Sequence, residues 1–105
     1  MKLSSKQRKF LETLAHDIEP MVRIGKGGVT PTVIQSVIDS LKAQELVKVK
    51  ILDNASVEKD EVADVLVEHA GCTLVRIIGR VLILFRPKDE EKKRRIVLPA
   101  DHESD

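Results

Sequence analysis

The chain has 105 residues and a formal net charge of +1, with 42% hydrophobic and 33% charged residues. This length predicts one domain, and the composition is that of an ordinary globular protein. No apolar run approaches the roughly 20 residues that a membrane-spanning helix needs, and the N-terminus lacks the apolar stretch of a signal peptide. The single cysteine, Cys72, cannot form an internal disulfide, which favours a reducing, cytoplasmic setting.

Charge is unevenly distributed along the chain. Residues 1–50 carry nine bases and five acids, and residues 71–95 carry eight bases and three acids. Between them, residues 51–70 carry one base and six acids, and the last ten residues carry three acids and no base. If the two basic segments meet in the fold, they form a positive face that can attract a polyanion although the total charge is close to neutral.

Apolar residues at helical spacing predict a first helix over residues 5–18, which Ser4 or Ser5 can cap. After Pro20, a short strand is predicted over residues 21–24. Three bases in the first turns of the helix oppose its dipole, an arrangement that indicates another role for them: Lys6, Arg8 and Lys9.

A glycine-rich turn, residues 25–28, separates this strand from a second helix. Thr30 offers an N-cap hydroxyl and Pro31 occupies the first helical position, so the helix is expected to run from there to about Ala43. Residues 46–52 then alternate in the manner of a strand. One face of this strand is apolar and the other is basic: Val47, Val49 and Ile51 against Lys48 and Lys50.

An acidic helix is predicted over residues 57–70, and Gly71 stands where a helix commonly ends. A hairpin follows, in which a strand over residues 72–78 reverses at a two-residue turn that begins with Gly79. The returning strand, residues 81–85, is continuously apolar. Such a run indicates a central strand that is covered on both faces.

This order of elements, αβαβαββ, predicts an α/β fold in which a compact four-stranded mixed sheet packs with three helices. The two crossover helices imply parallel pairings, and the last hairpin is antiparallel. The folded domain is expected to cover residues 1–87. A charged tail over residues 88–105 follows, with one apolar patch at residues 96–98 and an acidic end at residues 101–105.

Three glycines at positions 25–28 allow backbone conformations that other residues resist, and they let another backbone approach closely. Amide groups there can form an anion-binding nest, and Lys26 adds a positive charge near Arg23. The spacing fits neither a P-loop nor a dinucleotide fingerprint, because Pro20 and Thr30 stand where those motifs need glycine. What remains is Gly-x-x-Gly, the loop with which KH modules clamp nucleic-acid backbone; taken alone, the loop reads equally well as a tight turn.

The aromatic residues indicate what kind of RNA such a loop would hold. The chain has two phenylalanines, Phe10 and Phe85, and no tryptophan or tyrosine. Both phenylalanines lie on apolar faces and are expected in the core, so a base-stacking platform is not predicted. A protein of this kind should hold phosphate and sugar and read shape more than sequence, which favours structured RNA.

Four blocks of sequence stand in order along the chain: Phe10–His16, Val22–Thr30, Glu45–Lys50 and Ile78–Pro87. Together they resemble the successive signatures of a CRM domain, the chloroplast RNA splicing and ribosome maturation domain. The resemblance runs from about Ser4 to Pro87, and Arg95–Pro99 is similar to the same segment of the bacterial stand-alone members, the YhbY-like proteins. Gln44 departs from the pattern, since family members often carry histidine there.

The resemblance implies a fold similar to the C-terminal domain of translation initiation factor three. It also implies RNA binding through the glycine loop and adjacent bases, and association with precursors of the large ribosomal subunit, where ribosomal RNA is the expected partner and ribosomal proteins are further ones. The loop, the divided charge and the resemblance together give these candidate RNA-binding residues: Arg23, Gly25, Lys26, Gly27, Gly28, Lys48, Lys50, Arg76, Arg80 and Arg86.

Other functions are weaker alternatives. The acidic helix over residues 57–70 could hold a basic protein, which would make the chain an adapter on ribosome precursors. His69 and Cys72 lie three residues apart, but two ligands do not make a zinc site. No base–nucleophile pair is recognisable, so no catalytic residue, metal or cofactor is predicted and the chain is not expected to be an enzyme.

Overall fold

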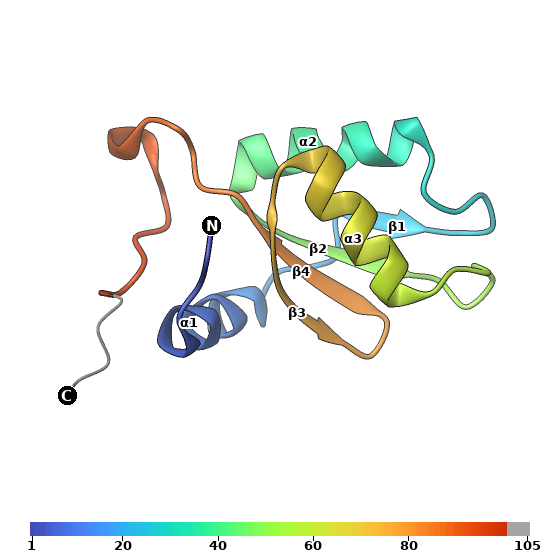
Figure 1. Ribbon diagram of the computed structural model, residues 1–105, viewed down its shortest axis with the longest axis horizontal. Helices are drawn as coiled ribbons and strands as arrows, with labels where there is room; N and C mark the ends of the chain where they lie inside the picture. Colours follow the sequence, from blue (N-terminus) through green and yellow to red (C-terminus); the bar gives the residue numbers. More distant parts are fainter. Residues whose placement is uncertain (101–105) are drawn as a thin grey trace.

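Helices and strands follow one another along the chain in the predicted order (Figure 1). A computed structural model describes residues 1–100; the predicted acidic end at residues 101–105 lies outside them. The first helix ends at Ala15, three residues earlier than expected, and the third begins two residues later than expected. The elements are α1 (Ser5–Ala15), β1 (Val22–Ile24), α2 (Pro31–Gln44), β2 (Leu46–Ile51), α3 (Lys59–Ala70), β3 (Thr73–Ile78), β4 (Val81–Phe85) and a short 3-10 helix, η1 (Glu91–Lys93).

The four strands form one mixed sheet in the order β1-β2-β4-β3. β1 is parallel to β2, whereas β4 is antiparallel to both of its neighbours. The expected parallel pairing of the strands on either side of α3 is therefore wrong: β2 and β3 run in the same direction, but β4 lies between them. The tight turn at Gly79 lets β4 fold back into this interior position, where its continuous apolar run can be buried on both faces.

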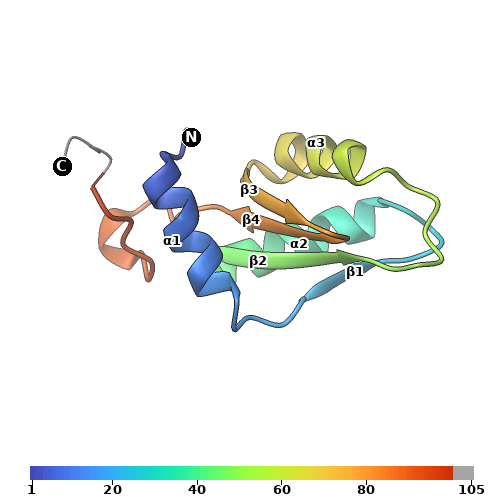
Figure 2. The ribbon, with the colours of Figure 1, turned by 90° about the horizontal axis from the view of Figure 1, so that it is seen from below.

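Helices cover the two faces of the sheet unequally. α2 and α3 pack side by side on one face, and with it they enclose a large apolar cluster that includes Val49, Leu66 and Leu82. α1 lies on the opposite face and crosses only one end of the sheet (Figure 2). Its cluster includes Ile83 and Phe85, so β4 is covered from both sides as predicted. Within residues 1–100, no helix is long and apolar enough to cross a membrane.

Capping residues explain two helix starts and one helix end. The Ser4 hydroxyl accepts a hydrogen bond from the Gln7 amide at 3.1 Å, and the Gln7 side chain reciprocates. The Thr30 hydroxyl accepts from the Val33 amide at 3.2 Å, which confirms the predicted cap of α2. α3 ends at Gly71, whose φ of 62° lies in the left-handed region that favours glycine.

Residues 86–100 return across the α1 end of the sheet. Ile96 and Leu98, from the apolar patch noted in the sequence, pack against the cluster beneath α1. The carbonyl of Pro99 accepts a hydrogen bond from the Gln7 side chain at 3.0 Å. This segment therefore contributes to the packing of the sheet's second face. The division of the chain at residue 87 stays a prediction.

Candidate nucleic-acid interface

The glycine loop projects between the end of β1 and the start of α2. The Gly28 amide donates a hydrogen bond to the Gly25 carbonyl at 3.0 Å, which closes a tight turn with Lys26 and Gly27 at its tip. Both tip residues are exposed. Within the described part of the chain, their own amides donate no hydrogen bond. Two backbone donors and one ammonium group are thus presented to solvent at the same point, a combination suited to an anion.

The fold explains the identity of only one of the three glycines in this loop. Gly28 has a φ of 71°, which explains its identity by backbone conformation. A Cβ added at Gly25 would make ordinary contacts, 3.7 Å from the Leu52 side chain and 3.8 Å from that of Asn54. A Cβ added at Gly27 would meet no atom of the described chain within 4 Å, and the φ of Gly27 is not positive. Neither conformation nor internal packing requires glycine at position 27, whereas close approach by another backbone would.

Beside the loop, the half of the sheet that α1 leaves uncovered carries three bases. Arg23 in β1 and Lys50 in β2 are direct cross-strand neighbours, and Lys48 lies two residues along on the same face. Like charges placed opposite each other on neighbouring strands are destabilising. In the described residues none of the three forms an ion pair with an acid. A bound anion would offset this repulsion.

Arg80 lies at the loop end of the sheet but is held by the chain itself. Its Nε donates to the Ile51 carbonyl at 3.1 Å and its Nη2 donates to the Leu52 carbonyl at 3.0 Å. Lys59 lies at the same end, with its Nζ 3.4 Å from the Gly79 carbonyl. The sequence analysis did not include Lys59 among the candidates. The one feature that could have indicated it is that Lys59 is the single base among residues 51–70.

Two other candidate residues lie elsewhere. Arg76 is on β3 at the opposite edge of the sheet and pairs with Glu12 of α1 at 3.4 Å. Arg86 follows β4 at the far end of the molecule, where its Nη1 donates to the Ala70 carbonyl at 3.2 Å. Of the predicted side chains, the structure thus gathers Arg23, Lys48 and Lys50 next to the loop and places Arg76 and Arg86 apart from it.

The structure gives no sign of a reactive cysteine or a metal site among the described residues. Burial raises the pKa of the Cys72 thiol to about 11, although the nearby charge of Arg86 acts in the other direction. A thiol of this kind is a poor nucleophile at neutral pH. Among residues 1–100, no three His, Cys, Asp or Glu side chains are grouped so that they could hold a metal ion. Arg8, whose position opposed the helix dipole, donates to the Leu74 carbonyl at 2.9 Å and to that of Val75.

The chain matches a known protein family over most of its length. The family model described as the CRS1 / YhbY (CRM) domain matches residues 3–86, most of the chain. The chain belongs to the CRM domain family. The match spans the glycine loop, the uncovered half of the sheet and all three helices of the CRM domain, and it ends where the segment 87–100 begins.

Two bacterial relatives of this CRM protein have a similar length. It is 37% identical over 97 residues to "Probable RNA-binding protein YqeI" of Bacillus subtilis, covering 92% of this chain and 99% of that one. It is 36% identical over 90 residues to a protein of Haemophilus influenzae named "RNA-binding protein", covering 86% and 91%. The solution structure of the hypothetical protein SAV1595 from Staphylococcus aureus is 38% identical and superposes with a TM-score of 0.74, covering 93% of this chain and all of that one.

Proposed function

We propose that this CRM protein is a binding protein, not an enzyme, and that it holds structured RNA by the sugar–phosphate backbone. The observation that carries the proposal is the position of three bases, Arg23, Lys48 and Lys50, that form no ion pair within residues 1–100. They lie beside an exposed loop in which neither backbone conformation nor packing among the described residues requires glycine at position 27. Phosphate would lie against the Lys26 and Gly27 amides, and the bases would contact neighbouring phosphates. The names of the two bacterial relatives support RNA as the partner.

The structure favours contact with backbone over contact with bases. Phe85 is 1% exposed, and Phe10 packs partly buried against the cluster beneath α1. Neither ring is available on the uncovered half of the sheet, so stacked single-stranded bases would find no aromatic platform there. Recognition would instead depend on the shape of a folded RNA and the spacing of its phosphates.

The resemblance to stand-alone bacterial CRM proteins extends the proposal to a cellular role. The RNA would be ribosomal RNA within precursors of the large ribosomal subunit, bound in the cytoplasm during assembly. Ribosomal proteins on the same precursors would be neighbours of the bound protein. The double variant Lys26→Gln/Gly27→Asp, here called the loop variant, tests the contact that this role requires.

The test measures affinity for a structured large-subunit RNA fragment across a salt series. The loop variant lowers the charge by two, and a Cβ at position 27 meets no described atom within 4 Å. Ser36→Glu/His69→Glu, here called the helix-face control, lowers the charge equally at exposed positions of α2 and α3. We expect weaker binding and a shallower salt dependence for the loop variant, by roughly 0.7–0.9 in slope for each phosphate that the variant no longer neutralises. Equal affinities of the loop variant and the control, with both folded, would rule out the loop.

A second candidate function, that of a protein adapter, rests on α3. Asp60, Glu61 and Asp64 are exposed on this helix and form no ion pair with any described base. A basic ribosomal protein could bind there while RNA occupies the opposite face. Reversal of these three charges should abolish capture of such a partner and leave RNA affinity intact; loss of both activities or of neither would argue against the adapter.

A further inference from the structure

Glu45, between α2 and β2, is buried and serves as the anchor of the C-terminal segment. Its side chain is fully inaccessible to solvent. Oε2 accepts a hydrogen bond from the Lys88 amide at 3.0 Å, and Oε1 accepts from the Arg95 and Ile96 amides at 2.7 and 3.1 Å. A buried carboxylate is costly unless it is hydrogen-bonded, and these three amides satisfy it.

The three donors come from both ends of one segment. Residues 88–96, here called the pinned loop, therefore leave the Glu45 carboxylate and return to it. The Arg94 Nε closes the loop further by donating to the Lys88 carbonyl at 2.6 Å. From the sequence, the run Lys92-Lys93-Arg94-Arg95 is expected in a flexible tail that contacts RNA or is merely solvated. The structure instead displays these four bases on a closed loop that includes the 3-10 helix η1.

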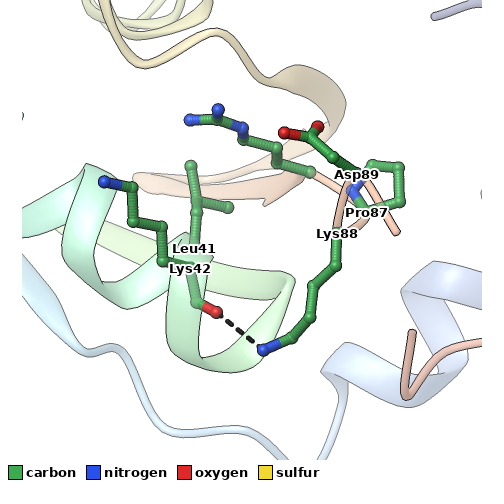
Figure 3. A pocket seen from close by; sticks show the side chains of 6 residues that line it. Leu41, Lys42, Pro87, Lys88 and Asp89 are labelled. Carbon is green, nitrogen blue, oxygen red and sulfur yellow. Dashed lines mark hydrogen bonds between the residues drawn. The ribbon is translucent and has the colours of Figure 1, made fainter. Parts of the chain in front are cut away.

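A small hollow of about 160 Å³ lies beside the pinned loop at the end of α2 (Figure 3). It is lined by Leu41, Lys42, Arg86, Pro87, Lys88 and Asp89. Three of these six residues are bases, contributed by α2, by the end of β4 and by the pinned loop, against one acid. The pinned loop also carries three acids, Asp89, Glu90 and Glu91, and Glu90 pairs with Lys93 at 3.2 Å. Bases still outnumber acids at this end of the molecule.

These bases retain donors that the chain does not use. The Lys88 Nζ donates to the Lys42 carbonyl at 3.0 Å, drawn as the dashed line in Figure 3, and the Arg86 Nη1 donates to the Ala70 carbonyl. A lysine has three donors and an arginine has five, so each side chain has donors left over. Lys42 is exposed, and its ammonium group has no partner in residues 1–100.

We propose that the pinned loop and the adjoining hollow form a second phosphate-contact surface for the same RNA. This inference rests on the proposed function. α2 has 14 residues, so its two ends are roughly 21 Å apart, with the glycine loop at one end and this surface at the other. A folded RNA can present phosphates to both ends at once. Arg86, distant from the glycine loop, belongs to this second surface, and Glu45 is a positioning residue that keeps the bases in place.

The test uses a second double variant, Lys42→Gln/Lys92→Gln, here called the pinned-loop variant. Both lysines are exposed and unpaired in the described chain, and the charge change again matches that of the helix-face control. If each lysine neutralises one phosphate, the salt slope becomes shallower by roughly 1.4–1.8 and affinity at 0.1 M salt falls roughly 25- to 60-fold. The glycine loop is intact in this variant, so the two surfaces are tested separately.

The outcomes distinguish the two proposals. A weakened loop variant together with a pinned-loop variant that binds like the control would overturn this inference and leave the proposed function standing. RNA binding that neither variant changes, or no RNA binding by the unmodified protein, would overturn both. A polyglutamate peptide serves as a second probe: if the pinned-loop variant loses that peptide and keeps full RNA affinity, the surface binds acidic protein and the assignment to RNA is wrong.

Discussion

Replacing Glu45 with glutamine should destabilise the protein by about 3 kcal/mol. Glutamine keeps the shape, but whichever way its amide is turned, at least one of the three backbone donors now faces an NH₂ group. A buried donor left without an acceptor costs about 1–3 kcal/mol, and each remaining bond to a charged acceptor loses about 1 kcal/mol when the acceptor becomes neutral. One lost donor and two weakened bonds sum to about 3–5 kcal/mol, and the expected loss is the lower end of this range.

Denaturant unfolding followed by circular dichroism measures this loss directly. In thermal unfolding, a loss of 1 kcal/mol lowers Tm by roughly 4–8 °C for a domain of this size, so Tm should fall by more than 10 °C. Glu58→Gln is the matched control, because Glu58 is exposed and makes no cap hydrogen bond; its effect should stay within about 0.5 kcal/mol. A loss below about 1 kcal/mol for Glu45→Gln would refute the reasoning that the carboxylate anchors the segment.

The contribution of Glu45 to stability should also depend on pH. Burial alone would raise the pKa of Glu45, but the three amides and the charge of Lys88 together hold it below its ordinary value of 4.5. The unfolded state then binds more protons, so this stabilisation is complete above pH 4.5 and is lost as the pH falls through the lower, folded-state pKa; acid titration of Glu45→Gln should lack that step, and an unchanged profile would contradict the assignment. Cys72, with its raised pKa and buried position, should react with a thiol reagent at pH 8 only at the rate of unfolding; rapid labelling of the folded protein would show that the thiol is accessible. Gly28→Ala should cost about 1–2 kcal/mol because of its left-handed φ, whereas Gly27→Ala should change stability by less than about 0.5 kcal/mol and still weaken RNA binding; equal unfolding midpoints for the two variants would contradict the different roles of these glycines.

Much of the fold could be predicted because local signals agreed with one another. Thr30 followed by Pro31 marks the start of α2, and Gly71 marks the end of α3. The continuous apolar run of β4 indicated burial on both faces. The position of β4 between β2 and β3 could not be obtained in the same way, because a crossover helix sets the relative direction of two strands but not whether a third strand comes between them.

Only part of the candidate site could be predicted, because local patterns place residues on a strand but do not give the order of the strands. Alternation in β2 placed Lys48 and Lys50 on one face, and the register with β1 adds Arg23 to them. Arg86 and Arg76 were included with the same group because they are basic, but their positions depend on strand order, which the sequence pattern does not specify. The anchoring role of Glu45 was not recognised, since a single acid next to a strand resembles a surface residue until its three distant amide partners are known.

The two apolar clusters draw on very different stretches of the chain. The buried residues of the cluster beneath α2 and α3 run from Val22 to Leu84, whereas the cluster beneath α1 joins Leu3 to Ile96 and Leu98. A chain cut back to residue 87 would therefore keep every buried residue of the first cluster but lose two apolar side chains of the second, so truncation should expose the face beneath α1 and leave the face beneath α2 and α3 covered.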